Sequence, residues 1–382
     1  MAERLEIDFV LTCGPGEDPA AKLRAIAFEQ TVELPPECVP ADLADAVVAR
    51  MERLDAADNG RHHATLSFNP DLIGNELTQL LNTLFGNISL QDGMRITDIR
   101  WPQSLLETFK GPAYGLAGLR ELTGVAAGQS LLCTALKPVG LDAGALAQRA
   151  YRFALGGMDI IKDDHGIADQ HWAPFRERLA ACQDAVQRAN AATGGSSLYF
   201  PNVTAPGPVL AERLDMAAAA GCRGVLICPW ITGLDALRWA RANHSLALMA
   251  HPALTGSYFR PEHGIAPELI LGDLFRLAGA DASIYPNQGG RFGFSSTTCH
   301  AINHHLRRPM GDLRACAPTP GGGVDAARAP DWVADYGADT ILLIGGSLYQ
   351  QGDVTAATRE LLHAIGRSGP CGAAAAGYDK GF

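Results

Sequence analysis

The chain has 382 residues, of which 47% are hydrophobic and 19% are charged, so it can bury a large core and is long enough for two domains. Its formal net charge is −10, and it lacks the clusters of Lys and Arg that neutralise the phosphates of a nucleic acid. We therefore expect no nucleic-acid partner. The charge does not exclude a small anionic substrate, because backbone N–H groups and a few cations in a local pocket decide that.

The first 125 residues are expected to form a small α+β domain. Alternating apolar residues predict strands over 5–13, 65–69 and 94–101, and helical spacing predicts helices over 19–30 and 75–84.

From residue 126 to 382, short apolar runs alternate with helical stretches. Strands that are buried on both faces read as continuous apolar runs, and eight such strands alternating with helices predict a parallel (β/α)₈ TIM barrel in an α/β chain. The sixth run is the least distinct. The eight predicted strands are 131–136, 158–161, 197–200, 224–228, 246–250, 282–285, 313–317 and 340–344.

The nine cysteines are scattered, and no pair has zinc-ligand spacing with matching histidines. We predict mostly buried, reduced thiols and a cytoplasmic protein. The N-terminus, Met1-Ala2-Glu3-Arg4, lacks the features of a signal peptide, and no apolar run reaches membrane-spanning length. A membrane partner is therefore not expected.

Residues suited to chemistry follow the predicted strands, at the barrel edge where active sites of this fold lie. They are Lys137 after the first strand, Lys162 to His165 after the second, Asn202 and Thr204 after the third, His251 after the fifth, Arg291 after the sixth, Gly321 to Gly323 after the seventh, and Gly345 and Gly346 after the eighth.

Lys162, Asp163, Asp164 and His165 directly follow the apolar residues of the second strand. Asp164 and His165 could bind a metal ion, and Lys162 could join them if CO₂ converted its amine to a carbamate. Lys162 could instead form a Schiff base with a carbonyl substrate, or it could belong to a structural ion pair. The pattern alone favours the metal site, because ionisable residues at such positions tend to be functional.

Lys137 and His251 each end an apolar strand. Lys137 is a candidate for acid–base work or for binding a substrate oxygen, with a surface lysine as the alternative, and His251 is either functional or a core histidine. The glycines at 321–323 and at 345–346 favour a phosphate site, because glycine lets backbone N–H groups approach phosphate oxygens closely. Either glycine run on its own is more typical of a turn, and only the two runs together, at adjacent strand ends, favour the phosphate site.

Three segments now resemble the RuBisCO large subunit in order and approximate spacing. They are Phe109-Lys110-Gly111-Pro112, Cys133-Thr134-Ala135-Leu136-Lys137-Pro138 and Gly156-Gly157-Met158-Asp159-Ile160-Ile161-Lys162-Asp163-Asp164, followed by the two glycine loops. The resemblance covers residues 29–346 and is most specific at Lys162-Asp163-Asp164. The chain looks like a RuBisCO-like protein, a homologue without carbon fixation.

The resemblance implies a role for each matching residue. Lys162 corresponds to the carbamylated lysine, Asp164 to a Mg²⁺ ligand, Lys137 to the lysine that handles protons at the reacting carbonyl, and His251 to a histidine near the substrate hydroxyls. The glycines around one phosphate correspond to Gly322, Gly345 and Gly346. Glu29 and Asn87 resemble residues that the amino domain contributes to a partner subunit's site, which implies a homodimer.

Five positions depart from the RuBisCO pattern. His165 stands where RuBisCO has a glutamate ligand, which makes Mn²⁺ or another divalent ion an alternative to Mg²⁺. Pro252 replaces an arginine that binds the second phosphate, and Thr255 and Ile284 replace histidines, so we expect a monophosphate substrate. Arg291 replaces the lysine that steers CO₂, which argues against carboxylation of ribulose bisphosphate.

These features predict a metal-dependent enzyme that acts through an enediolate of a phosphorylated keto-sugar or keto-sugar acid. The sequence alone favours decarboxylation of 3-oxo-isoapionate 4-phosphate, because Arg291 could bind the carboxylate. The alternative is isomerisation of 5-methylthioribulose 1-phosphate in sulfur salvage. A Schiff-base aldolase and a sugar-phosphate sensor without activity are two further classes that the sequence leaves open.

Overall fold

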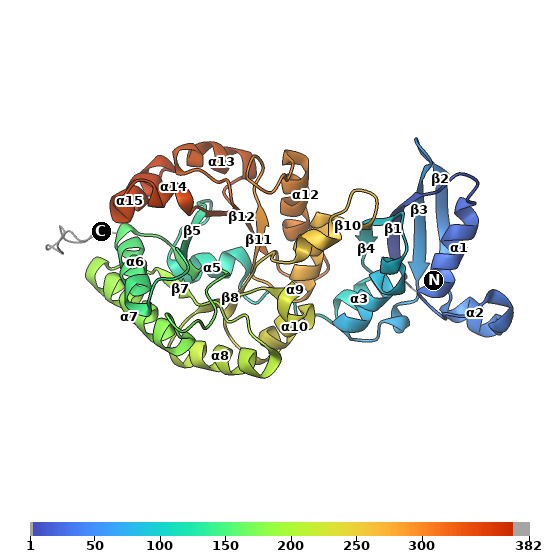
Figure 1. The fold of residues 1–382 in the computed structure, drawn as a ribbon, viewed down its shortest axis with the longest axis horizontal. Coiled ribbons are helices and arrows are strands. Elements are labelled where there is room, and N and C mark those ends of the chain that lie inside the picture. The colour runs from blue at the N-terminus through green and yellow to red at the C-terminus, as the bar shows by residue number, and fades with distance from the viewer. Residues whose placement is uncertain (1–2, 370–382) are drawn as a thin grey trace.

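The computed structural model describes residues 3–369, which form two sheets with their helices (Figure 1). The larger sheet has eight parallel strands in the order β7-β6-β5-β13-β12-β11-β9-β8. A bridge between Asn202 and Leu226 joins its two edge strands, and the Val203 N–H donates to the Leu226 carbonyl oxygen at 2.9 Å. The predicted (β/α)₈ barrel is confirmed. Its strands are β5 (Leu131–Leu136), β6 (Ile160–Asp163), β7 (Leu198–Phe200), β8 (Gly224–Ile227), β9 (Ala247–Ala250), β11 (Ala282–Pro286), β12 (Ala317–Gly321) and β13 (Ile341–Leu343).

Helices surround the barrel (Figure 1). The short helix α5 (Gly115–Thr123) instead packs Leu116 and Leu119 into the interior apolar cluster with the strands, next to Leu131 at the start of β5. This helix therefore fills the end of the barrel opposite the candidate site. The other helices are α6 (Ala143–Gly156), α7 (Phe175–Thr193), α8 (Gly207–Ala219), α9 (Pro229–Thr232), α10 (Leu234–Asn243), η4 (Thr255–Tyr258), η5 (Leu269–Leu274), α11 (Phe275–Leu277), α12 (Ser296–Arg307), η6 (Ala326–Arg328), α13 (Ala329–Tyr336), α14 (Gly346–Tyr349) and α15 (Val354–Ala364).

The smaller sheet has five strands in the order β10-β4-β1-β3-β2. Its strand β10 (Gly264–Ile265) comes from the segment between β9 and β11 of the barrel and pairs in parallel with β4. The barrel segment thus completes the N-terminal sheet. The other elements are β1 (Leu5–Thr12), α1 (Pro19–Glu29), η1 (Pro36–Cys38), α2 (Ala41–Val47), β2 (Arg50–Ala56), β3 (Arg61–Phe68), η2 (Pro70–Leu72), α3 (Leu77–Phe85), η3 (Asn87–Leu90), β4 (Met94–Arg100) and α4 (Gln103–Leu106).

A buried aspartate fixes the N-terminal sheet to the barrel. The Trp101 indole N–H, just after β4, donates to Asp273 Oδ2 at 2.9 Å, and the same carboxylate contacts Arg308 at 2.6 Å and His305 at 3.0 Å. Asp273 is fully buried, and these three contacts offset the cost of removing its carboxylate from water.

Five strands were misplaced by at least two residues or were not predicted. Strand β3 begins at Arg61 and not at residue 65, and β10 was not predicted. The seventh barrel strand is 317–321 and not 313–317, because its sequence Ala-Pro-Thr-Pro-Gly has no apolar run to mark it. The second strand begins two residues later than predicted, at Ile160. The edge strand β2 was missed because nearly all of its side chains are exposed, which removes the alternation of buried and exposed residues.

The eight cysteines in the described residues are free thiols, and six of them are buried. Cys13 is half-buried and Cys38 exposed, and Cys371 lies outside the described residues. Between residues 3 and 369, no helix has both the length and the apolar character needed to cross a membrane.

Candidate active site

The alternation of side chains along β6 separates its ionisable residues into two groups. Ile160 belongs to the interior apolar cluster and Ile161 to the cluster beneath the helices. Because successive side chains of a strand point to opposite faces, Lys162 and Asp164 face the barrel interior and Asp163 faces outward. The structure therefore brings Lys162 and Asp164 to one site and places Asp163 elsewhere.

Lys162 is almost completely buried, with 2% of its surface exposed. Its ammonium donates to the Asp163 carbonyl oxygen at 3.1 Å. Burial lowers the pKa of Lys162, and the nearby Asp164 carboxylate only partly offsets that effect. A lowered pKa raises the fraction of neutral amine, which is the form that reacts with CO₂ or with a carbonyl.

Asp164 pairs with Lys137 across the mouth of the barrel. The Lys137 ammonium donates to Asp164 Oδ2, and the Gly166 N–H donates to Oδ1 at 3.1 Å. Burial alone would raise the pKa of Asp164, but these two hydrogen bonds outweigh it and hold the pKa below its ordinary value. Asp164 is thus ionised at neutral pH and is the negative centre of the site.

His165 and His251 stack at this centre. Their ring centroids are 4.1 Å apart and the planes differ by 15°. The Ala253 N–H donates to Nδ1 of His251 at 3.2 Å, which leaves Nε2 to carry the proton of the neutral ring. Burial and then the charge of Lys162 lower the pKa of His251 well below its ordinary value, and burial also lowers that of His165.

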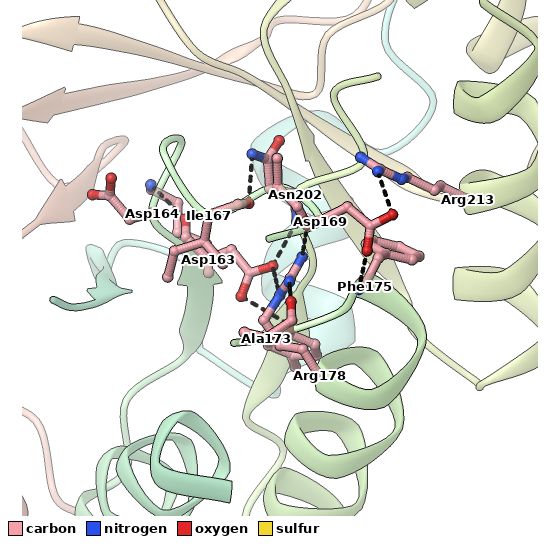
Figure 2. A network of polar contacts seen from close by, with 12 residues as sticks. Asp163, Asp164, Ile167, Asp169, Ala173, Phe175, Arg178, Asn202 and Arg213 are labelled. Atoms are coloured by element: carbon pink, nitrogen blue, oxygen red, sulfur yellow. Dashed lines mark hydrogen bonds and ion pairs between the residues drawn. The ribbon is translucent and has the colours of Figure 1, made fainter. Parts of the chain in front are cut away.

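On the outer face of β6, Asp163 is the centre of a second network (Figure 2). Its Oδ2 accepts from Arg178 Nε at 3.0 Å and from the Asn202 N–H at 2.9 Å, and its Oδ1 accepts from the Tyr199 hydroxyl at 2.8 Å. All four side chains are buried. In Figure 2 the Asp164 side chain points away from this network.

The same network holds the loop that carries Asp164 and His165. Arg178 donates to the carbonyl oxygens of Ala168 and Ala173, both at 2.7 Å. The Asn202 side chain donates to the carbonyl oxygens of His165 and Ile167, both at 3.0 Å. The loop over residues 164–173 is therefore held by hydrogen bonds from Arg178 and Asn202, which belong to the network outside the barrel interior.

The two glycine loops lie after neighbouring strands β12 and β13. Gly322 has φ +71°, a conformation that favours glycine. Space above Gly345 and Gly346 is open, since a Cβ at either position would meet no atom within 4 Å. This arrangement leaves room for a phosphoryl group beside exposed backbone.

The loop that carries Arg291 lies against the first glycine loop. A Cβ on Gly290 would come within 2.0 Å of the Gly322 carbonyl oxygen, so the two backbones are in direct contact. Arg291 itself is exposed, with its guanidinium 4.9 Å from the Phe292 ring centroid. Arg291 also adds to the positive potential that acts on His165.

Glu29 and Asn87 lie together but apart from this site. The Asn87 side chain donates to Glu29 Oε1 at 2.9 Å and to Glu33 Oε1 at 3.1 Å. Helix α1, which ends at Glu29, lies across the N-terminal sheet from the barrel (Figure 1). Within one chain, these two residues do not reach the strand-end residues.

The donor set fits a divalent cation only if Lys162 is modified. Residues 3–369 contain no group of three His, Cys, Asp or Glu side chains placed to bind a metal. Asp164 supplies a carboxylate and His165 an imidazole, while a carbamate on Lys162 would supply the further anionic oxygen that a hard cation prefers. The buried amine with its lowered pKa fits that modification.

Two important residues were not found from the sequence. Arg178 lies at helical spacing among the apolar residues Phe175, Leu179 and Cys182. A charged residue on the apolar face of a predicted helix could have identified it from the sequence. Tyr349 follows the second glycine loop, and its hydroxyl contacts the backbone on either side of Leu136. No sequence pattern marks that contact.

Comparisons with known proteins agree with the fold and the motifs. The family described as ribulose bisphosphate carboxylase large chain, catalytic domain, matches residues 115–290. The 5-methylthioribulose-1-phosphate isomerase of Rhodospirillum rubrum is 43% identical over 87% of this chain and 88% of its own length. The 2,3-diketo-5-methylthiopentyl-1-phosphate enolase of Geobacillus kaustophilus is 32% identical over 76% of this chain and 70% of its own.

Among solved structures, a Rubisco-like protein from Rhodopseudomonas palustris matches with a TM-score of 0.87 and 38% identity, covering 96% of this chain and 98% of its own. The class is thus an α/β-barrel protein of the RuBisCO type. The chain belongs to the RuBisCO large-chain family, among its RuBisCO-like proteins.

Proposed function

We propose that this protein is a metal-dependent isomerase of 5-methylthioribulose 1-phosphate. The observation that carries the proposal is the 43% identity, over nearly the full length of both chains, to the isomerase of that name from Rhodospirillum rubrum. The single pair of glycine loops, with Pro252 where an arginine would bind a second phosphate, agrees with a monophosphate substrate.

This proposal reverses the order that the sequence alone favours. The hypothesis of 3-oxo-isoapionate 4-phosphate decarboxylation depended on Arg291 as the residue that binds the substrate carboxylate. The relatives reported above carry isomerase and enolase names, and none of them is named a decarboxylase. The exposed Arg291 is equally suited to any anion that enters the mouth of the barrel.

Lys162 as a carbamate, Asp164 and His165 would hold the cation. When bound, Mg²⁺ or Mn²⁺ would polarise adjacent substrate oxygens and stabilise the negative charge of the enediolate. Despite its burial, hydrogen bonds from Lys137 and Gly166 hold the pKa of Asp164 below its ordinary value, so its carboxylate is ionised and suited to a cation. Lys137 contacts Oδ2 of this carboxylate, so the ammonium would compete with a cation for that oxygen.

Proton transfer is assigned to Lys137. Isomerisation of a ketose requires a proton to leave the carbon beside the carbonyl and to return at another carbon. The Lys137 side chain lies at the barrel mouth and is 43% exposed, so a substrate can reach it. His251 would donate from Nε2 to a substrate hydroxyl, while Gly322, Gly345 and Gly346 would bind the phosphate through backbone N–H groups.

We further propose a homodimer in which Glu29 and Asn87 act in the partner's site. Their separation from the barrel site within one chain supports this assignment. The structural neighbours include an octameric RuBisCO from Pyrococcus horikoshii OT3, which matches with a TM-score of 0.88 and 25% identity.

The test is turnover of a substrate panel by purified protein with bicarbonate and either Mg²⁺ or Mn²⁺. The panel contains 5-methylthioribulose 1-phosphate, 2,3-diketo-5-methylthiopentyl 1-phosphate and 3-oxo-isoapionate 4-phosphate. We expect the first to be isomerised and EDTA to abolish activity. If only the third compound reacts and CO₂ is released, the decarboxylase hypothesis is favoured instead. Trapping by borohydride at Lys162 in the presence of EDTA would indicate a Schiff-base enzyme. Binding without turnover would indicate a sensor.

A further inference from the structure

Tyr349 connects the second glycine loop to the backbone of Lys137. It is the last residue of α14, which begins at Gly346. Its hydroxyl donates to the Ala135 carbonyl oxygen at 2.9 Å and accepts from the Lys137 N–H at 3.1 Å. One side chain therefore contacts both backbone groups that flank Leu136 at the end of β5.

The two hydrogen bonds of the Tyr349 hydroxyl take the place of backbone hydrogen bonds that β13 does not provide to the end of β5. Strands β5 and β13 pair up to Cys133 and Leu343, and the Ile344 N–H still donates to the Cys133 carbonyl oxygen at 2.9 Å. The chain then turns away at Gly345 into the glycine loop. Among residues 3–369, Ala135 and Lys137 consequently have no strand partner on that side, and the Tyr349 hydroxyl supplies both the donor and the acceptor.

The ring of Tyr349 is fixed by α6. Phe153 packs edge-on with centroids 5.4 Å apart, and the Arg149 guanidinium lies 5.3 Å from the ring centroid. Burial raises the pKa of Tyr349, so its hydroxyl remains protonated and can donate at neutral pH. The ring is thus held by α6 while its hydroxyl contacts the end of β5.

We propose that Tyr349 is a positioning residue that couples occupancy of the phosphate loop to the placement of Lys137. A phosphoryl group bound at Gly345 and Gly346 would order α14, and the Tyr349 hydroxyl would transmit that order to the Lys137 backbone. The Lys137 amine is then aligned with the substrate carbon only when the phosphate is in place. This inference rests on the proposed function for the role of Lys137 in proton transfer.

Tyr349→Phe is the direct test, because it retains the ring and removes only the hydroxyl. We expect kcat for 5-methylthioribulose 1-phosphate to fall about tenfold, since small displacements of a catalytic group are costly, while KM changes by less than about twofold. The matched control is Tyr151→Phe, a tyrosine of α6 whose ring also lies under an arginine, with Arg188 Cζ at 5.4 Å. An unchanged kcat in Tyr349→Phe would overturn the proposal.

A double variant separates positioning from general stability. If Tyr349 acts through Lys137, Tyr349→Phe will have no further effect on kcat in a Lys137→Ala background. A purely structural role predicts the same loss in both backgrounds, and that result would overturn the proposal.

Hydrogen exchange tests the coupling without any activity. We expect inorganic phosphate to slow exchange of the Lys137 amide in the wild-type protein and to have no such effect in Tyr349→Phe. An equal effect in both proteins, or none in either, would overturn the coupling. If the wild type turns over none of the panel substrates, the proposed function fails and this measurement still decides whether Tyr349 links the two elements.

Discussion

Asp163 and Arg178 form an ion pair in which neither side chain is exposed, with 3.0 Å between Oδ2 and Nε. The next residue, Asp164, faces the barrel interior and pairs with Lys137 instead. Two adjacent aspartates therefore have different tasks: the first supports the loop over residues 164–173, and the second supplies the carboxylate of the candidate metal site.

Arg178→Met should destabilise the fold by about 3 kcal/mol, because it leaves the Asp163 carboxylate buried and without its cation. Urea denaturation measures the change. Arg188→Met on the same helix is the control, since the Arg188–Asp184 pair is exposed and should contribute at most about 1 kcal/mol. Equal losses for the two variants would contradict a structural role for the buried pair.

Lys162→Arg should abolish the bicarbonate-dependent part of Mn²⁺ binding, because arginine keeps a positive charge but forms no carbamate. Calorimetric titration with and without bicarbonate measures the effect. The wild-type protein supplies a second readout, a carbamate signal in its ¹³C NMR spectrum with labelled bicarbonate. Lys110→Arg, an exposed lysine outside the site, should behave as wild type. Bicarbonate-independent binding in the wild type would contradict carbamylation.

His165→Glu should shift metal preference from Mn²⁺ towards Mg²⁺, because a carboxylate oxygen replaces an imidazole nitrogen. The ratio of the two dissociation constants is the measurement. His165→Gln provides an uncharged oxygen donor of similar length as a control for the added charge. A ratio that stays constant in both variants would show that His165 is not a ligand.

Asp8 should contribute stability that is lost in acid. Burial alone would raise the pKa of Asp8, but hydrogen bonds from Arg100 and Thr65 outweigh it, so the pKa lies below its ordinary value of 3.8. The contribution is therefore present above pH 3.8 and disappears as pH falls through the lower, folded-state pKa.

Asp8→Asn should accordingly destabilise the protein at pH 6 and differ little from wild type near pH 2, as measured by urea denaturation across that range. The difference should be modest, since the Arg100 side chain is 47% exposed. Asp55→Asn, at a carboxylate that is 67% exposed, serves as the control. A difference that grows in acid would contradict the assignment.

The sequence was sufficient for elements with a clear apolar pattern. Strand β5 was predicted with its observed bounds, because all six of its residues are buried. Strand β12 was misplaced because its five residues include two prolines and a terminal glycine and form no apolar run. Local pattern cannot reveal which side chain on a distant element satisfies a backbone group, so the contact from Tyr349 to Lys137 became visible only in three dimensions.

The central claim is tested most directly by ³¹P NMR of 5-methylthioribulose 1-phosphate incubated with the protein, Mg²⁺ and bicarbonate. We predict a new phosphate ester resonance from the isomer, formed rapidly by the wild type and by Lys110→Arg and much more slowly by Lys137→Ala. An unchanged substrate resonance with the wild-type protein, under conditions where the Rhodospirillum rubrum isomerase converts it, would contradict the account.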